Sequence, residues 1–213
     1  IVQTPQANDV AVKLAAETVL APVDDVPATA ILSGKCEVIT FENEFVDLYG
    51  LDKLAATCNV KFRPPLSALA PLLDKYTQRC YLRDLGLPVP NFAALEMPEL
   101  PVGFEFPVVV KARRNGYDGQ GTFVIKDKSA LESLYRRYPD TPFLIEEFVD
   151  FDRELAALVA RGINGEIVNY PILETQQQDG ICRRVLTIDN LPAEIVNNCD
   201  AIATELMASL GAI

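Results

Sequence analysis

Residues 106–125 are the part of this sequence that most constrains its fold. A β-branched run ends at Lys111, a loop with three glycines in residues 116–121 follows, and a second β-branched run starts at Thr122. Glycine permits left-handed backbone angles and lets amide groups converge on one point, and lysine adds a compact positive charge. The segment therefore predicts two paired strands whose connecting loop binds an anion, with a nucleoside triphosphate as the leading candidate.

The glycine loop by itself leaves two interpretations open. Three glycines in six residues fit a bulged hairpin turn as well as a phosphate-binding loop. The loop is not a Walker loop, which needs a Lys and a Ser or Thr at the start of a helix. It is not a dinucleotide fingerprint either, because a strand follows it. Arg113 and Arg114, which come soon after Lys111, favour anion binding.

Composition excludes several classes of protein. The chain has 213 residues, 49% hydrophobic and 23% charged, enough for one large or two small globular domains. Its net charge of −11 argues against a nucleic-acid partner. Because the chain has no histidine, Ser-His and Cys-His nucleophilic catalysis are excluded within it. Five scattered cysteines are typical of reduced thiols in a cytoplasmic protein, and no apolar run reaches the roughly 18 residues of a membrane span.

The residue pattern predicts two units, an α/β unit over 1–65 and an α+β unit with mostly antiparallel strands over 66–213. In the first unit we expect an irregular segment over 10–21, a strand over 36–41, a helix over 48–58 and a linker over 61–65.

In the second unit, glycine and proline positions separate the expected elements. Gly86 is expected to end a first helix, Ser129 to cap a second one with Glu132 at capping-box spacing, and Asn164-Gly165 to form a hairpin turn. The expected helices are 68–85, 129–138 and 195–210, and the expected strands are 108–111, 122–126, 143–148, 153–161 and 166–173.

A second candidate cluster follows the strand that ends at Glu146 and Glu147. These carboxylates fit a solvated strand edge, or a strand whose backbone meets the edge of a purine. In the second interpretation Glu154 accepts hydrogen bonds from ribose hydroxyls. Phe148 and Val149 would then contact the base, although a core position for Phe148 is an open alternative.

Glu42 and Glu44 follow another predicted strand, residues 38–41. Ligands of α/β sheets bind beyond the carboxyl ends of the strands, so either side chain is a candidate substrate contact. An ordinary polar loop fits the same residues equally well.

Five ordered segments carry a resemblance to a known family: VITFENE (38–44), LLDKYTQRCYLRDLGLPVP (72–90), VVVKARRNGYDGQG (108–121), LIEEFVDFDREL (144–155) and YPILETQQQDGICR (170–183). With them, the chain resembles the ATP-grasp family, and within it the 5-(carboxyamino)imidazole ribonucleotide synthases, or phosphoribosylaminoimidazole carboxylase ATPase subunits, of purine biosynthesis. The resemblance implies an ATP-grasp fold with a partial Rossmann-like pre-ATP-grasp unit over 1–65. A partial ATP-grasp unit would cover 66–213, with a glycine-loop lid over about 104–148.

The resemblance also implies residue roles. Lys75 and Lys111 would contact ATP phosphates under a closing glycine loop, with adenine and ribose held further along the chain. The implied nucleotide site comprises Lys75, Lys111, Gly116, Tyr117, Asp118, Gly119, Gln120, Gly121, Thr122, Glu146, Glu147, Phe148, Val149, Glu154 and Gln177. The implied substrate contacts are Tyr117 and Glu42 or Glu44. Two positions depart from the family pattern, since Gln120 replaces a common basic residue and Gln177 a common histidine.

The implied reaction uses ATP to convert bicarbonate into carboxyphosphate, and the amine of aminoimidazole ribonucleotide then captures the resulting CO₂. The implied partners also include a second copy of the protein, because homodimers are common in the family. Mg²⁺ is implied with ligands beyond Ile213, since no acidic pair within the chain is a good substitute. The start at Ile1 without Met and the end after a helix lead us to expect a fragment truncated at both ends, with weak ATP binding and no turnover of its own.

Related readings stay open. Formate-dependent glycinamide ribonucleotide transformylases and biotin carboxylases share the arrangement of lysine strand and glycine loop. A non-catalytic ATP-binding or scaffold module of the same fold is a further alternative, favoured by Gln120, Gln177 and the missing metal ligands.

Overall fold

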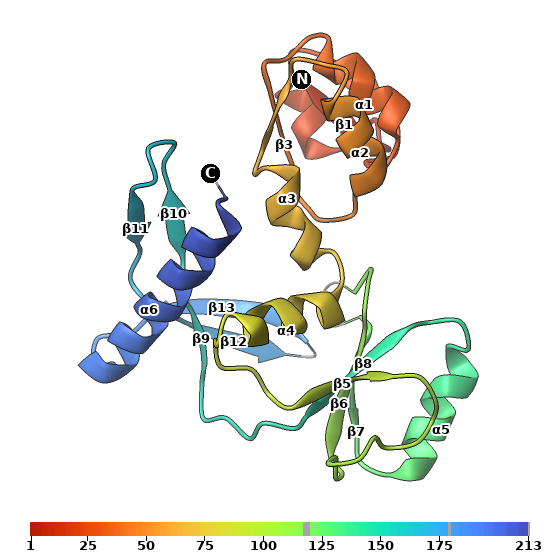
Figure 1. The fold of residues 1–213 in the computed structure, drawn as a ribbon, viewed down its shortest axis with the longest axis vertical. Helices are drawn as coiled ribbons and strands as arrows, with labels where there is room; N and C mark the ends of the chain where they lie inside the picture. Colours follow the sequence, from red (N-terminus) through yellow and green to blue (C-terminus); the bar gives the residue numbers. More distant parts are fainter. Residues whose placement is uncertain (117–119, 179, 213) are drawn as a thin grey trace. The chain divides into compact units, whose positions relative to one another are not determined.

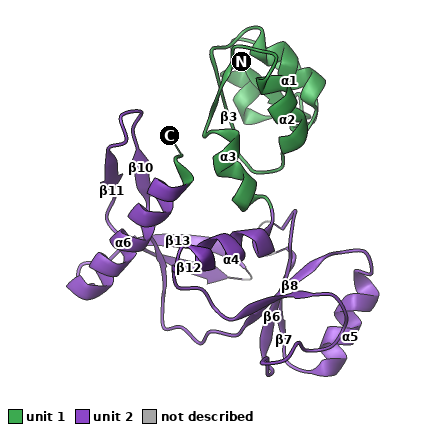
Figure 2. Cartoon of the chain, in the orientation of Figure 1, with its two compact units in different colours: residues 1–73, 210–213 green, residues 74–209 purple. Residues whose placement is uncertain are grey.

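The computed structural model describes residues 1–116, 120–178 and 180–212. It divides into two compact units (Figures 1 and 2), Ile1–Leu73 with the terminal residues from Leu210, and Asp74–Ser209. The sequence placed this division after residue 65, whereas the structure places it after Leu73. Both units mix helices and strands, as the ATP-grasp expectation requires.

Unit 1 contains two pairs of parallel strands, β1 with β2 and β3 with β4. Its core is formed by apolar side chains such as Leu51, which is only 2% exposed. The elements of unit 1 are β1 (Val2–Thr4), η1 (Val10–Lys13, a 3₁₀ turn), β2 (Thr18–Leu20), α1 (Val26–Ser33), β3 (Val38–Thr40), α2 (Leu48–Ala55), β4 (Lys61–Arg63), α3 (Leu66–Leu69) and η2 (Ala70–Leu72, also 3₁₀).

Two expectations for unit 1 are wrong. Residues 10–21, expected to be irregular, contain η1 and β2. Residues 61–63, expected within a linker, form β4, because Phe62 is buried and pairs in register with Ile39 of β3. The apolar side chain at this position joins the core and makes the segment part of the unit.

Unit 2 is built mainly from antiparallel strands, as expected. Its largest sheet has the order β5-β8-β6-β7, a second has the order β13-β12-β9, and β10 pairs with β11 around Gly165. The elements of unit 2 are α4 (Lys75–Asp84), β5 (Phe92–Leu95), β6 (Val108–Ala112), β7 (Thr122–Ile125), α5 (Lys128–Arg137), β8 (Phe143–Glu147), β9 (Glu154–Ala156), β10 (Val159–Arg161), β11 (Ile167–Asn169), β12 (Leu173–Gln178), β13 (Ile181–Thr187) and α6 (Ala193–Leu210).

The four-stranded sheet has two chemically different faces. Val108 and Val110 of β6 are fully buried with Ile145 of β8 in a core that α5 completes. Since successive side chains of a strand point to opposite faces, Lys111 and Glu146 lie on the other face. Lys111 pairs in register with Leu144 of β8, two residues before Glu146. Lys111 and Glu146 are therefore diagonal neighbours across the two strands.

The single helix expected over 68–85 is interrupted in the structure. The chain turns through α3 and η2, and α4 then begins at Lys75 after Asp74. The Asp74 carboxylate accepts hydrogen bonds from the amides of Tyr76 (2.9 Å) and Thr77 (3.2 Å), which makes it the N-cap of α4. Gly86 follows the helix with φ +73°, in agreement with its expected role as the terminating glycine.

The N-cap of α5 is Asp127 rather than Ser129. The Asp127 carboxylate accepts a hydrogen bond from the Ala130 amide at 2.9 Å, and the helix begins at Lys128. Aspartate and serine are both strong N-caps, so the capping-box spacing selected the wrong one of two suitable residues.

Candidate active site

The centre of the candidate site is the buried carboxylate of Glu146 on β8, which is 3% exposed. Lys111 of β6 donates a hydrogen bond to Glu146 Oε2, and Arg79 of α4 donates one to Oε1. The interpretation of Glu146 as a solvated strand edge is therefore wrong. A buried carboxylate needs such partners, because an unpaired charge in the interior is strongly destabilising.

The two cations also determine the protonation of Glu146. Burial raises the pKa of this carboxyl, but the hydrogen bonds and charges of Lys111 and Arg79 lower it more, so that the pKa lies below its usual value. Glu146 is consequently a carboxylate at neutral pH, and the cluster of one anion and two cations carries a net positive charge.

This lowered pKa predicts acid sensitivity. The folded chain holds the Glu146 proton less tightly than the unfolded chain, so the stabilisation is complete above the unfolded pKa of about 4.3 and is lost as pH falls below it. We expect the free energy of unfolding to fall more steeply with acidification in the wild type than in Glu146→Gln. Urea denaturation between neutral pH and pH 3 measures this. The exposed Glu99→Gln is the control and should keep the wild-type slope; an equally steep slope in Glu146→Gln would contradict the prediction.

Lys75 lies beside the glycine loop. Its backbone amide donates to the Arg113 carbonyl at 2.9 Å, which joins the start of α4 to the end of β6. A Cβ atom added to Gly116 would stand 3.6 Å from the Lys75 ammonium nitrogen. The structure thus brings together Lys75 and Gly116, at the start of the loop that follows Lys111, and their contact with ATP phosphates stays a prediction.

Asp74 and Arg113 hold this arrangement. Arg113 Nε lies 3.0 Å from both carboxylate oxygens of Asp74, and an Arg113 terminal nitrogen lies 2.8 Å from Oδ2. Burial raises the Asp74 pKa, but Arg113 and the amides of Thr77 and Tyr76 lower it more, so that the pKa lies below its usual value. The Arg113 guanidinium also lies over the Tyr76 ring, 5.1 Å from its centroid.

The glycine loop closes a hairpin between β6 and β7. Lys111 pairs in register with Thr122, and the Ala112 amide donates to the Gly121 carbonyl at 2.7 Å. Gly116 needs to be glycine for space, since a Cβ there would stand 2.9 Å from the Gln120 carbonyl oxygen. The predicted site residues Tyr117, Asp118 and Gly119 lie outside the described residues.

Gly121 gives the loop a testable conformational requirement. Its φ is +83°, and an added Cβ would stand 3.1 Å from the Ala112 side chain. Gly121→Ala is therefore expected to lower the free energy of unfolding by about 1–2 kcal/mol. Gly103→Ala is the matched control, because Gly103 has φ +89° with no atom near its Cβ position. Thermal or urea denaturation measures both, and a smaller loss at Gly121 than at Gly103 would contradict the expected role of Ala112.

The end of β8 exposes apolar side chains. Phe148 is 42% and Val149 49% exposed, so the alternative that Phe148 belongs to the core is wrong. Glu147 is exposed as well, and its carboxylate accepts a hydrogen bond from the Asn91 amide at 2.9 Å. Exposed apolar groups directly after a buried strand are available to contact a base.

Glu154 and Gln177 meet in the three-stranded sheet. Glu154 of β9 pairs in register with Thr175 of β12, whose hydroxyl donates to Glu154 Oε1. The Gln177 side-chain amide donates to the same oxygen at 2.7 Å. The structure therefore joins these two predicted residues in one hydrogen-bonded group on the sheet.

Glu42 and Glu44 are both exposed in the segment that directly follows β3 in unit 1. This position at the carboxyl end of a parallel strand agrees with the expected local structure. Their assignment to substrate stays a prediction.

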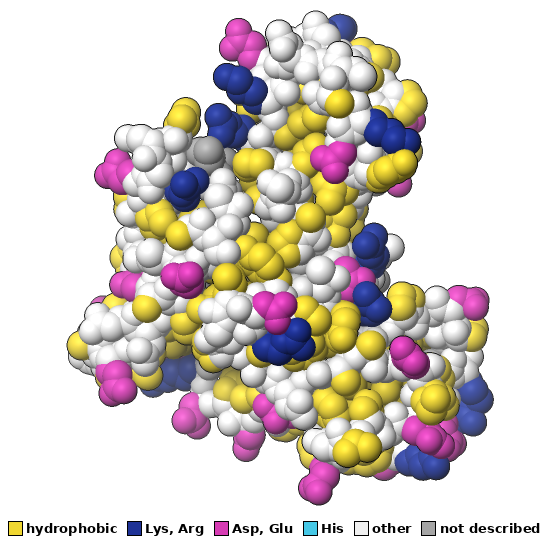
Figure 3. All heavy atoms as spheres, viewed as in Figure 1, with side chains coloured by type: hydrophobic (Ala, Val, Ile, Leu, Met, Phe, Trp, Pro, Cys, Tyr) yellow, Lys and Arg dark blue, Asp and Glu magenta, His cyan; other side chains and the backbone are white. Residues whose placement is uncertain are grey.

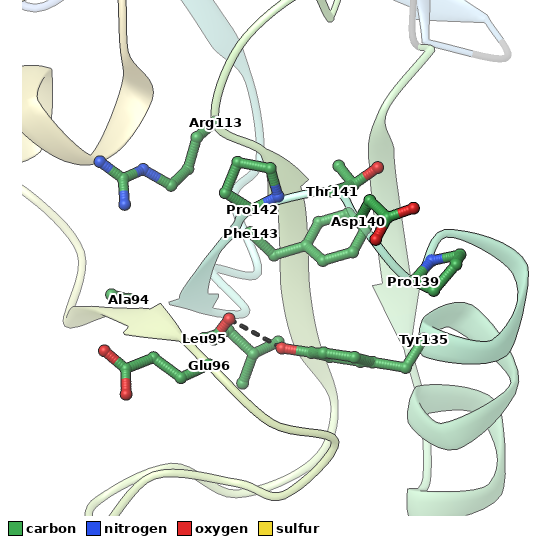
Figure 4. A pocket seen from close by; sticks show the side chains of 10 residues that line it. All are labelled: Ala94, Leu95, Glu96, Arg113, Tyr135, Pro139, Asp140, Thr141, Pro142 and Phe143. Atoms are coloured by element: carbon green, nitrogen blue, oxygen red, sulfur yellow. Dashed lines mark hydrogen bonds between the residues drawn. The ribbon is translucent and has the colours of Figure 1, made fainter.

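A cavity of about 520 Å³ lies elsewhere in unit 2, between the end of β5, the end of α5 and the start of β8 (Figure 4). The Tyr135 side chain extends across it from α5, and its hydroxyl donates a hydrogen bond to the Leu95 carbonyl at 2.7 Å. Its walls include Arg113 but none of the residues predicted to bind nucleotide. Burial, and to a smaller extent Glu96, raise the Tyr135 pKa.

Sequence reasoning missed two members of the site, Arg79 and Asp74, and noted Arg113 only as a charge that favours anion binding. Arg79, Asp74 and Arg113 make the ion pairs that hold Glu146, Lys75 and the end of β6. A signal existed for Arg79, which lies four residues after Lys75 and therefore on the same face of α4. Pro71, which lies in η2, was an available signal that the helix expected over 68–85 is interrupted before Asp74.

The described residues contain no ready-made group of metal ligands. In residues 1–116, 120–178 and 180–212, no group of three or more His, Cys, Asp or Glu side chains could hold a metal ion. The two buried carboxylates, Asp74 and Glu146, are already bound by arginine and lysine.

None of the helices in these described ranges is long and apolar enough to cross a membrane. On the face drawn in Figure 3, Lys and Arg side chains lie scattered among acidic and apolar ones.

Comparison with known proteins finds relatives that share one name. The chain is 46% identical over 213 residues to the N5-carboxyaminoimidazole ribonucleotide synthase of Synechococcus elongatus, covering 98% of this chain and 54% of the relative. It is 49% identical over 196 residues to the Synechocystis enzyme of the same name, covering 91% and 49%. The chain thus spans about half the length of the curated relatives it matches.

A solved structure and a family model also match this chain. The crystal structure of a carboxyaminoimidazole ribonucleotide synthase from Aspergillus clavatus complexed with ATP matches with a TM-score of 0.89 at 26% identity, over 97% of this chain and 56% of that one. The model of the ATP-grasp domain matches residues 80–213, which is more than half of the chain. This chain therefore belongs to the ATP-grasp family.

Proposed function

We propose that the protein carrying this chain is an ATP-grasp ligase that carboxylates 5-aminoimidazole ribonucleotide with bicarbonate, through carboxyphosphate, in de novo purine biosynthesis. The observation that carries the proposal is the arrangement of Lys75, Lys111 and Gly116 around the end of β6. The 46% identity to a carboxyaminoimidazole ribonucleotide synthase supports the choice of substrate.

In the proposed reaction, a bicarbonate oxygen attacks the γ-phosphorus of ATP, and the bond from this phosphorus to the bridging oxygen breaks to release ADP. Carboxyphosphate then separates into CO₂ and phosphate. The amine of the ribonucleotide attacks the carbon of CO₂ and loses a proton, which forms the new carbon–nitrogen bond. Lys75 and Lys111 would neutralise phosphate charge during the first step.

The proposal includes further nucleotide contacts, some of them supported by exposure and hydrogen bonds in the described residues. The backbone after Glu147 and the exposed Phe148 and Val149 would hold adenine, and Glu154, oriented by Gln177, would accept hydrogen bonds from ribose hydroxyls. Closure of the loop over 116–122 would keep water from the acyl phosphate.

Other parts of the proposal rest on the family pattern. Tyr117 and Glu42 or Glu44 would reach the ribonucleotide, and units 1 and 2 would be the pre-ATP-grasp and ATP-grasp parts, with a lid over about 104–148. We further propose a cytoplasmic homodimer. Mg²⁺ is the proposed metal. No step of the mechanism is assigned to it, because no group of three or more His, Cys, Asp or Glu side chains among the described residues could hold a metal ion.

The test is phosphate release from ATP by the protein expressed at the full length of its gene, with aminoimidazole ribonucleotide and bicarbonate added separately and together. Release that requires the ribonucleotide is the expected result. Release with formate and glycinamide ribonucleotide instead would indicate a transformylase. ATP binding without release under any condition would indicate a non-catalytic nucleotide-binding module.

A further inference from the structure

The cluster around Glu146 presents an electrostatic problem for ATP binding. The Lys111 ammonium, proposed to bind phosphate, donates to Glu146 Oε2. A phosphate and Glu146 would compete for the same cation. If Lys111 turned away from a carboxylate with no other partner, a buried charge would be left uncompensated, which is strongly unfavourable.

Arg79 supplies the second partner. It binds Oε1 of Glu146, whereas Lys111 binds Oε2, so the two cations occupy different oxygens of one carboxylate. The Arg79 side chain is 21% exposed and the Glu146 side chain 3% exposed, so the contact lies largely away from solvent. Guanidinium and carboxylate can therefore stay paired while the ammonium changes its partner.

Arg79 lies on α4, the same helix as Lys75. It lies one helical turn after Lys75 on α4, and Asp74 fixes the start of this helix by capping it and by binding Arg113. The same helix therefore places Lys75 beside the glycine loop and Arg79 against Glu146, the carboxylate that also binds Lys111.

We propose that Arg79 is a positioning residue that keeps Glu146 paired and thereby frees Lys111 to bind the phosphates of the nucleotide. The inference rests on the proposed ATP-binding function and assigns a role to a residue that does not itself touch the nucleotide. It requires that loss of Arg79 weakens binding of phosphates, not binding of the base.

The experiment compares the affinities of ATP and adenosine for the full-length protein by equilibrium dialysis, because adenosine has no phosphate for Lys111 to bind. In Arg79→Gln the ratio of ATP affinity to adenosine affinity should fall about tenfold, the loss of one charge-assisted contact. Arg79→Lys should restore most of the ratio. Arg83→Gln, one turn further along α4 and paired with exposed Asp84, is the matched control and should keep the wild-type ratio. An equal loss for ATP and adenosine in Arg79→Gln would overturn the inference.

A second pair of variants remains decisive if Arg79→Gln does not fold. In Glu146→Gln the buried charge is gone, so Lys111 no longer needs a substitute partner, and adding Arg79→Gln should leave the ratio unchanged. A further tenfold fall in the double variant would mean that Arg79 binds phosphate itself, and would overturn the inference. Failure of the wild type to bind ATP would overturn this inference and the proposed function together. ATP binding without ribonucleotide-dependent phosphate release would remove only the proposed reaction.

Discussion

Replacing Lys111 with methionine is expected to lower ribonucleotide-dependent phosphate release about 100-fold or more, the usual effect of removing one group that stabilises developing charge. Methionine keeps most of the volume of the lysine stem and loses only the ammonium. The loss should appear in kcat as well as in KM for ATP, because phosphate charge must be neutralised in the transition state.

The matched control for this variant is Lys126→Met. Lys126 is exposed just after β7, at the far end of the hairpin from the glycine loop. It should keep the wild-type rate, and so separate a specific effect of Lys111 from a general effect of net charge. Similar rates for the two methionine variants would contradict the assignment of Lys111 to phosphate.

Replacing Asp74 with alanine is expected to lower the free energy of unfolding by about 2–4 kcal/mol, because this buried carboxylate both caps α4 and pairs with the partly buried Arg113. The affinity for ATP should fall too, since Lys75 is the first residue of the helix that Asp74 caps. Urea denaturation and ATP titration of the same variant measure the two effects.

Two further variants divide this effect into its parts. Asp74→Asn keeps an acceptor for the helix amides and loses the charge, so it should retain part of the stability. Asp127→Ala removes the cap of α5, a single hydrogen bond to the Ala130 amide, and should cost only about 1 kcal/mol. If Asp74→Ala were no more damaging than Asp127→Ala, the ion pair with Arg113 would contribute nothing to stability.

The parts of the fold that depend on local pattern could be predicted from the sequence. The strands on either side of the glycine loop were recognisable because each is a short run rich in β-branched residues next to turn residues. The hairpin around Gly165 and the termination of α4 at Gly86 followed from single glycines, which the structure shows with positive φ. The break before Asp74 was missed, because the apolar residues from Ala68 to Leu73 fit a helix as well as the turn that they form.

The site was predictable residue by residue but not as a set of contacts. Lys111 and Glu146 were both identified, yet their ion pair depends on β8 lying next to β6, which no local pattern specifies. Arg79 reaches Glu146 only because α4 covers that face of the sheet, so its part in the site follows from tertiary packing. For the same reason Glu146 was placed against adenine, while the structure places its carboxylate between two cations.

The strand order β5-β8-β6-β7 also bears on how this unit folds. The hairpin of β6 and β7 can form early, since its strands are close in sequence, but β5 finds its sheet partner only when β8 arrives about 50 residues later. Until then β5 and one edge of β6 have unpaired backbone groups, which are the usual starting points of aggregation. The insertion of β8 satisfies both edges in one step, and the same step brings Glu146 beside Lys111. Completion of the sheet and formation of the ion pair between Lys111 and Glu146 are therefore coupled.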